Sequence, residues 1–519
     1  MSAEQGTLVE GLEERPAAGP PSETPIPRKP RFKAIDRQQM SWREIDVERL
    51  IEPDHPARAI WELICQLNLG RFEERIKAVE GVAGREATDP RLLISLWLYA
   101  VSRGVWSARE LAEWSKYDPG CQWLTGVGAI NHHTLSDFVT VEAAAMNQLF
   151  VDVLGVLMAE DLADLERVMQ DGTKIRACAK RSSFKGEERL QECRKEAEQH
   201  LAALQQQSET KDGARQRAAR LRAARERVER LDRAAEQFQQ LAADKPAGEQ
   251  AKVRVSLSDP DARVMKQGDD GGFAPSYNAQ ISTDARTGVI VAYDVSQAGE
   301  DTGELVPAVE RIQRNVGVPP DQIVVDGGYT TRENVTDMAG RPTEFVGSFG
   351  EDRSRNKLRR RGVSEAFMPD KFVRDEASNT YTCPAGKQLR PKGNKKLMGA
   401  TEWHYRAKPS DCKACPHRSE CCPKTVSNGR LLIRIEEHPA VTEFRQKMQT
   451  EEYRSIYRQR AQVAEFSNAC LKAKKGLRRF LRRGLSKVRA ETGWGCLSCN
   501  VSIWIRRCWK VQTKPRATT

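Results

Sequence analysis

A long charged stretch divides this chain into two apolar parts. From about Lys185 to Ala243 most residues are Ala, Gln, Arg and Glu, while Leu, Ala and Val recur at helical spacing. This pattern predicts a pair of long antiparallel helices with a break near "SETKDGA". Strand-like runs both precede and follow the stretch. We therefore interpret residues 185–245 as a helical insertion into a domain whose sheet is assembled from both sides of it.

Apolar runs bounded by short turns predict the sheet itself. The segment "LERVMQDGTKIRACA" is typical of a strand, and "SYNAQISTD" and "GVIVAYDVSQAG", joined by "ARTG", predict a hairpin. A helix in "TGELVPAVERIQRNVG", a strand in "DQIVVDGGYTT", a helix in "TRENVTDMAG" and a strand in "TEFVGSF" follow. Strands and helices in this order predict an α/β fold with a sheet of mixed direction.

Helical spacing also predicts a block of helices before the sheet. It is clear in "DPRLLISLWLYAVSRG" and "SARELAEWSKY", with helix starts at Asp89-Pro90 and Ser107. The basic and aromatic residues of this block have two explanations, DNA binding or core packing. We place the helical domain at 32–160. Residues 1–31, rich in Pro, Gly and Glu, are expected to be a disordered tail, and residues 511–519 a second tail.

Composition restricts the compartment and the partner. The longest apolar stretches, such as "LLISLWLYAV", are shorter than the roughly 20 residues of a membrane-spanning helix. The N-terminus has no apolar signal core, so we expect a cytoplasmic protein without a membrane partner. The 84 Lys and Arg against 72 Asp and Glu favour a polyanionic partner. Nine basic residues and no acid lie from Lys472 to Arg489, which favours phosphate contact over a solvated helix face.

Two aspartates end strand-like runs and precede glycine. They are Asp171, in "QDGT", and Asp326, in "VVDGGYTT". Turn chemistry explains either one alone. If the sheet brings them together, the carboxylates repel each other unless a cation lies between them, which suits Mg²⁺ or Mn²⁺ because these ions prefer oxygen ligands. A third carboxylate is then expected from the helical segment near the C-terminus.

The order of "QDGTKI", "NAQISTD", "VVDGGYTT" and "YRQRAQVAEFSNACLKAKKGLRRFLRRG" resembles the DDE transposases of bacterial insertion sequences, closest to the insertion-sequence-1182 type. The resemblance runs from about residue 35 to 505. In that group the third acid lies in a helix as Tyr, two residues, Arg, three residues, Glu, six residues, then Lys or Arg. This chain has Tyr457, Arg460, Glu465 and Lys472, with one extra residue between Arg and Glu.

The resemblance implies a ribonuclease-H-like catalytic fold in which Asp171, Asp326 and Glu465 bind two divalent ions, Mg²⁺ or Mn²⁺. Two-metal sites stabilise the attacking and leaving oxygens of an in-line displacement at phosphorus. One ion would activate water to nick the element end, and later the liberated 3′-hydroxyl for attack on target DNA. Lys472, two turns after Glu465, would hold a phosphate beside the metals.

Other acids compete for these positions. A solvated helix face is the simple explanation for three glutamates near the C-terminus, which are Glu451, Glu452 and Glu491. We interpret three aspartates after the hairpin strands as turns or strand ends, although the first could lie near the site; they are Asp284, Asp294 and Asp301.

Five of the thirteen cysteines gather in a basic, loop-rich segment that we treat as a small cysteine-rich insertion, residues 350–440. Four thiolates with one CxxC pair suit a tetrahedral zinc ion. The alternative is a set of reduced thiols, with Cys422 as an incidental neighbour. Cysteines in a chain without a signal peptide argue against a disulfide scaffold. The expected structural zinc ligands are Cys383, Cys412, Cys415 and Cys421.

Together these features predict a DNA transposase whose catalytic domain, residues 161–349 and 441–510, is interrupted by both insertions. The expected partner is DNA, both the terminal inverted repeats of the element and the target, and the resemblance implies a homodimer on two DNA ends. Two alternatives stay open, a ribonuclease-H-like nuclease without strand transfer and a catalytically inactive zinc-dependent DNA-binding protein. The residues expected to contact DNA are Tyr457, Arg460, Lys472, Lys475, Arg478, Arg479, Arg482 and Arg483.

Overall fold

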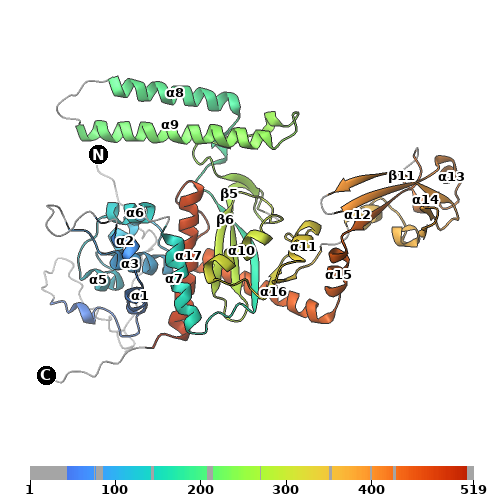
Figure 1. Ribbon diagram of the computed structural model, residues 1–519. Coiled ribbons are helices and arrows are strands. Elements are labelled where there is room, and N and C mark those ends of the chain that lie inside the picture. The colour runs from blue at the N-terminus through green and yellow to red at the C-terminus, as the bar shows by residue number, and fades with distance from the viewer. Residues whose placement is uncertain are drawn as a thin grey trace, which may run out of the picture. The chain divides into compact units, whose positions relative to one another are not determined.

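The computed structural model describes most of the chain from Glu44 to Lys510 (Figure 1). Both expected tails and the expected break between the insertion helices lie outside the described residues. Residues from Asp46 onward belong to one compact unit. The described residues are 44–74, 76, 86–141, 145–206, 214–268, 271–349, 353–397, 400–424 and 428–510.

A block of helices precedes the sheet, as the periodicity predicts. Its helix starts follow from local sequence. The Asp89 side chain accepts a hydrogen bond from the Arg91 amide, with Pro90 in the first turn, and the Ser107 side chain accepts from the Glu110 amide. The helices are α1 (Pro56–Cys65), α2 (Gly70–Glu73), α3 (Pro90–Ser102), α4 (Ala108–Trp114), α5 (Pro119–Thr125), α6 (His132–Val141) and α7 (Met146–Ala159).

The central sheet is of mixed direction, which confirms the α/β prediction. Its strands are β1 (Arg167–Arg176), β4 (Arg263–Lys266), β5 (Phe273–Asp284), β6 (Ile290–Ser296), β7 (Gln322–Val325) and β8 (Glu344–Val346). Strand β5 lies antiparallel between β6 and β1, and β4 pairs with the first residues of β5. Strand β7 is parallel to β1, and β8 is parallel to β7. Helices α10 (Leu305–Val316) and α11 (Arg332–Met338) follow β6 and β7.

Two helices near the C-terminus pack on different strands of the sheet. Helix α16 (Glu451–Ala469) contacts β1, β5 and β7, and α17 (Leu485–Arg507) contacts β6 as well as α3 and α7 (Figure 1). The approach of α17 to β6 requires a glycine, because a Cβ at Gly493 would overlap the Tyr293 hydroxyl. A π-helical turn, Cys470–Lys474, extends α16, and a disulfide joins Cys470 to Cys499 of α17. None of the described helices is both long and apolar enough to cross a membrane.

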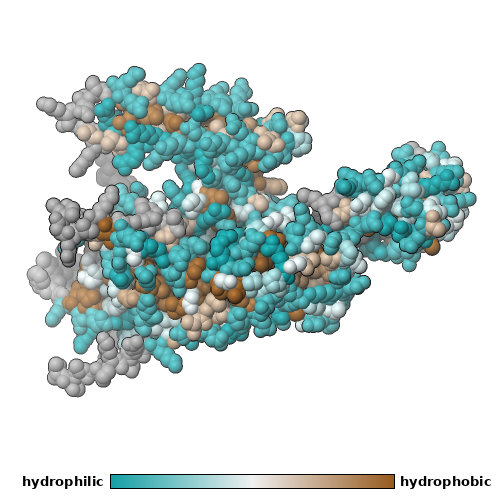
Figure 2. Space-filling model, in the orientation of Figure 1, coloured by the Kyte–Doolittle hydropathy of each residue, from teal (hydrophilic) through white to brown (hydrophobic). Residues whose placement is uncertain are grey.

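The charged stretch forms the predicted helical hairpin, α8 (Glu187–Gln206) and α9 (Ala214–Ala243). Arg194 of α8 pairs with Asp232 of α9, and Arg217 of α9 donates to the carbonyl of Gln205 of α8, so the two helices run antiparallel. They share a small apolar core of their own that includes Leu190 and Leu231. The visible face of the hairpin is mainly hydrophilic (Figure 2). Short strands β2 (Phe184–Lys185) and β3 (Val255–Ser256) pair at its base.

The cysteine-rich segment is not the loop-rich region that we expected. It contains a five-stranded antiparallel sheet around a small core that includes Tyr405 and Leu432. Its longest strand carries Lys, Pro and Gly and has few apolar residues, so the sequence lacks strand-like alternation there. The elements are α12 (Arg353–Arg360), β9 (Val373–Asp375), β10 (Thr380–Thr382), β11 (Gln388–Leu397), β12 (Ala400–Ala407), α13 (Pro409–Lys413), α14 (Arg418–Cys421), β13 (Leu431–Glu437) and α15 (Pro439–Lys447).

Candidate active site

The register of β1 and β7 brings Asp171 and Asp326 to neighbouring positions. The last paired residues of these parallel strands are Gln170 and Val325, and each aspartate is the next residue of its strand or turn. Asp326 also has the turn role that its glycines indicate, since its Oδ1 accepts a hydrogen bond from the Gly328 amide at 2.7 Å. The two acids are therefore neighbours where the β1–β7 pairing ends. Asp326 follows the end of β7, but Asp171 lies inside β1 and pairs with Ile281 of β5, so the prediction that Asp171 ends its strand is wrong. Pairing with β5 continues β1 beyond the glycine.

Asp171 is in an electrostatically strained position. Burial raises its pKa to about 6, and the nearby charges of Asp326 and Asp301 add to this, while Arg460 opposes it. Arg460 Nη1 lies 3.9 Å from Asp171 Oδ1, and Asn468 Nδ2 donates to Asp171 Oδ2 at 2.9 Å. Carboxylate oxygens that repel each other fit a hard divalent cation. Within the described residues, however, no three His, Cys, Asp or Glu side chains form a group arranged to hold a metal ion.

Helix α16 contributes side chains to the site, although the expected third acid that it carries is not among them. Arg460 and Asn468 reach Asp171 from this helix, and the Ser467 hydroxyl is hydrogen bonded to that of Thr283 at 2.8 Å. Glu465 lies between them in sequence but is exposed. In the part of the chain that the structure describes, it makes neither a hydrogen bond nor an ion pair with Asp171 or Asp326. It is three residues before Asn468, about 60° away around the helix.

A third aspartate, Asp301, lies close to Asp171, although we interpreted it as a turn residue. Its Oδ1 accepts from Asn278 Nδ2 and Gln280 Nε2, each at 2.7 Å. The same oxygen occupies the space that a Cβ at Gly172 would take, so Gly172 is needed for this approach. The loop after β6 carries no local signal for this placement, because only the pairing of β5 with its two neighbours brings the loop there.

The other aspartates of the hairpin have structural partners. Asp284, which we considered near the site, accepts from the Thr287 amide at 2.9 Å and the Thr287 hydroxyl at 2.8 Å, and so closes the turn after β5. Asp294 pairs with Arg311 at 2.8 Å and with Arg489 at 2.7 Å. Both carboxylates are therefore used within the fold.

Two residues of the basic run face inward. Burial lowers the pKa of Lys475 to about 8, and its Nζ donates to the Ser502 hydroxyl at 2.8 Å. Arg482 Nη1 lies 3.7 Å from the carboxylate of Glu491. Glu491 is fully buried because α17 packs between β6 and the N-terminal helices, so its interpretation as part of a solvated helix face is wrong. These cations have partners within the protein.

The rest of the run is placed differently. Arg478, Arg479 and Arg483 are exposed, and Lys472 is half-buried. Burial lowers the pKa of Lys472, and the charge of Asp171 opposes that shift, so Lys472 lies within electrostatic reach of the aspartate. Tyr457 packs beneath β1 and β7, with the Arg460 guanidinium 5.8 Å from its ring centroid.

A groove of about 1400 Å³ opens beside the aspartates. Asp301, Gly327 and Gly328 line it next to Asp326, and Lys174 of β1 and Arg445 of α15 line it farther out. Its volume exceeds the roughly 300–1,000 Å³ of a typical small-molecule pocket, so its size suits a polymeric ligand.

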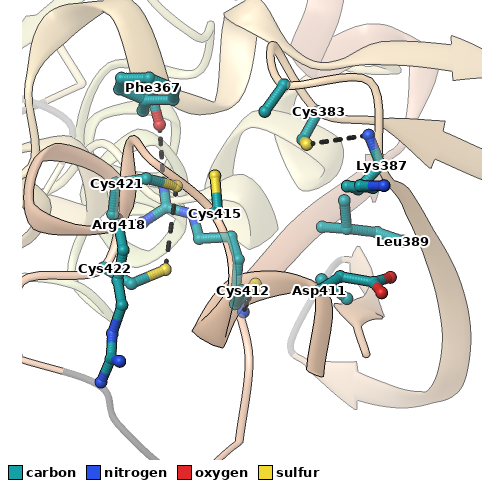
Figure 3. Close-up of a pocket in the computed structure, with 13 residues that line it drawn as sticks. Phe367, Cys383, Lys387, Leu389, Asp411, Cys412, Cys415, Arg418, Cys421 and Cys422 are labelled. Carbon is teal, nitrogen blue, oxygen red and sulfur yellow. Dashed lines mark hydrogen bonds between the residues drawn. The ribbon is translucent and has the colours of Figure 1, made fainter. Parts of the chain in front are cut away.

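The cysteine-rich segment holds a second candidate site, in which five thiols line one cavity of about 30 Å³ (Figure 3). The Lys387 amide donates to Cys383 Sγ at 3.3 Å, and the Sγ atoms of the two adjacent cysteines are hydrogen bonded at 3.8 Å. Sulfur donors fit zinc, although the described side chains are not in a metal-holding arrangement. Cys422, which we treated as incidental, lines the same cavity. The thiols are those of Cys383, Cys412, Cys415, Cys421 and Cys422.

Comparisons with known proteins give two family matches. Residues 382–504 match the transposase DDE domain, and residues 45–140 match the transposase domain DUF772. A solved piggyBac transposase synaptic complex with hairpin DNA is similar at 11% identity over 89% of this chain and 77% of that chain, with a TM-score of 0.29. No curated protein matches the chain. The two family matches, one at each end of the described chain, support a DDE transposase.

Proposed function

We propose that this protein is a DNA transposase that cleaves the ends of an insertion sequence and transfers the 3′-hydroxyl strand to target DNA. The observation that carries the proposal is the β1–β7 register, which makes Asp171 and Asp326 neighbours in a chain that matches transposase families. The mixed sheet would be the ribonuclease-H-like core, and the enzyme would act on DNA in the bacterial cytoplasm as a homodimer on two ends.

Asp171 and Asp326 would hold two Mg²⁺ or Mn²⁺ ions from the sheet, and Glu465 would complete the site from α16. Bound ions would supply stabilisation of the attacking and leaving oxygens in an in-line displacement at phosphorus. Asn468 and Arg460 fix the Asp171 carboxylate, so its oxygens keep one orientation. Glu465 lies about 60° around α16 from Asn468, so a rotation of the helix would bring it toward the pair.

The chain also provides contacts for the DNA. Lys472 would hold a phosphate beside Asp171, because the two side chains already interact electrostatically. The exposed arginines Arg478, Arg479 and Arg483 would continue along the backbone, whereas Lys475 and Arg482 are occupied within the protein. The zinc site, if the cysteine cavity binds zinc through its thiolates, would stabilise the five-stranded sheet around it.

The test uses DNA ends taken from inverted repeats that flank the coding region. Glu465→Gln and Asp326→Ala should each reduce Mg²⁺-dependent cleavage to background, while Glu452→Gln, an exposed acid at the start of α16, should leave it unchanged. If Asp326→Ala retains the cleavage of the wild type, the metal-site proposal is wrong.

A second substrate separates the alternatives. An oligonucleotide with a pre-exposed 3′-hydroxyl should be joined to target DNA by the wild type. Cleavage without any joined product would identify a nuclease. DNA binding without activity in Mg²⁺ or Mn²⁺ would identify an inactive DNA-binding protein.

A further inference from the structure

The base of the helical insertion is fixed to the basic run that follows α16. Arg233 of α9 donates from Nε and Nη2 to the two carboxylate oxygens of Asp261, each at 3.0 Å. Asp261 is buried, and its Oδ2 also accepts from the Leu485 amide at 2.8 Å. One step earlier, the Gly484 amide donates to Asp259 at 3.0 Å. Helix α9 and residues 484–485 therefore share one anchor.

Arginines from two segments gather next to this anchor. Arg483 is exposed, and its Nε donates to the carbonyl of Cys178 after β1 at 3.1 Å. Burial lowers the pKa of Arg230 on α9, and the charges of Arg483 and Arg227 lower it further, while Glu226 offsets them in part. The Nε of Arg230 is buried without a hydrogen-bond partner among the described residues. Like charges repel each other, and a polyanion would relieve the repulsion among these arginines.

The same arginines connect back to the candidate active site. Arg478 Nε donates to the Lys472 carbonyl at 3.1 Å, and Lys472 is within electrostatic reach of Asp171. The main chain of Arg176, on β1, bridges to that of Arg479. Arg176, Arg478 and Arg479 are all exposed. Positive side chains therefore follow one another from the aspartates, along the basic run, to the insertion.

We infer that Arg227 and Arg230 of α9 bind the phosphate backbone of duplex DNA, so that the helical insertion prolongs the basic path that leads to Asp171. The choice of partner rests on the proposed function. Helix α9 has 30 residues, which corresponds to a length of about 45 Å. That exceeds one turn of duplex DNA, about 34 Å. Its mainly hydrophilic visible face suits a hydrated phosphate contact (Figure 2).

The inference is tested by the salt dependence of DNA binding. Full-length protein is titrated into a fluorescently labelled duplex of mixed sequence, and anisotropy gives the affinity at several salt concentrations. Each lost phosphate contact lowers the slope of log affinity against log salt by about 0.9, so Arg227→Gln with Arg230→Gln should lower it by about 1.8. Arg227→Lys with Arg230→Lys should keep the slope.

A matched control lies on the same helix. Arg222 and Arg225 are exposed, and Arg225 is about 160° around the helix from Arg227. Arg222→Gln with Arg225→Gln removes the same charge and should leave the slope unchanged. The inference is overturned if both glutamine variants lower the slope equally. It is also overturned if the Arg227 and Arg230 variant keeps its helical circular dichroism and its slope does not fall.

Failure of the inference differs from failure of the proposed function. If the wild type cleaves DNA with Mg²⁺ but the Arg227 and Arg230 variant keeps the full slope, only the role of the insertion is wrong. If the slope falls as expected but no metal-dependent cleavage occurs, the DNA path stands and the transposase proposal fails. A wild type that does not bind duplex DNA contradicts both.

Discussion

The ion pair between Arg482 and Glu491 gives the sharpest test of which charged residues are structural. The Glu491 side chain is 0% exposed and that of Arg482 is 15% exposed. Glu491 also accepts from the main-chain amides of Leu481 at 2.9 Å and Arg482 at 3.1 Å. The Arg482 guanidinium lies 5.6 Å from the ring centroid of Trp97 in α3. Glu491→Gln keeps the side-chain shape and removes the negative charge.

The expected cost follows from burial. Breaking a buried ion pair leaves one charge without compensation, which destabilises a protein by about 3–5 kcal/mol. A whole domain is stable by only about 5–15 kcal/mol, so the variant should lose a large part of its stability. Arg482→Met with Glu491→Leu removes both charges and should recover most of the loss. Recovery should be incomplete, because the two amides that Glu491 binds lose their acceptor, at about 1–3 kcal/mol for each buried group.

Urea unfolding followed by tryptophan fluorescence measures these differences, with Trp97 as one of the ten tryptophans that contribute to the signal. The control is Glu113→Gln, which breaks an exposed pair with Lys116 and should change the free energy of unfolding by less than about 1 kcal/mol. Full stability of Glu491→Gln would refute the reasoning. If that stable variant also lost DNA cleavage, Glu491 would replace Glu465 as the proposed third acid.

Three further predictions concern other buried or crowded positions. Burial lowers the pKa of Lys475 in the folded chain to about 8, so above that pH the folded chain has released a proton that the unfolded chain still binds. The free energy of unfolding should therefore rise by up to about 3 kcal/mol between pH 8 and about 10.5. Lys475→Met should abolish this rise, as measured by unfolding midpoints at the two ends of that pH range. Gly172→Ala should remove metal-dependent cleavage, because the new Cβ would overlap the Asp301 carboxylate. Gly340→Ala should retain cleavage, because there is open space at its Cβ. A gel assay of cleaved DNA, with DNA binding measured in parallel, checks both variants. Elemental analysis of the purified wild-type protein should find about one zinc ion per chain. Cys412→Ser should lose the zinc ion, and Cys65→Ser should keep it. A wild-type protein without zinc contradicts the proposed zinc site.

The sequence predicts most strands of the sheet because these strands carry their own apolar run and turn. It does not predict β4, in which only two of four residues are apolar. It also indicates Asp171 and Asp326, since both end such runs next to glycine. It gives no sign of Asp301, whose position depends on the pairing of β5 with β1 on one side and β6 on the other. Long-range register of this kind has no local pattern.

The burial of individual cations in the basic run also cannot be predicted from the sequence. In sequence, Lys475 and Arg482 look the same as Arg478 and Arg479. In the fold, the chain turns sharply between α16 and α17, where Leu477 and Phe480 are buried. Lys475 is buried with them, whereas the arginines between Leu477 and Phe480 are exposed. The side-chain environment therefore depends on tertiary packing and cannot be inferred from charge density.

The position of α17 has a consequence for how the protein is made. This helix is synthesised after β6, α3 and α7, and it packs on all three. Domains often fold in order from the N-terminus during synthesis. Here the early helices and the sheet must wait, with apolar surface uncovered, until residues near Trp504 are translated. A gene copy truncated before α17 would therefore yield an aggregation-prone chain rather than a smaller working protein.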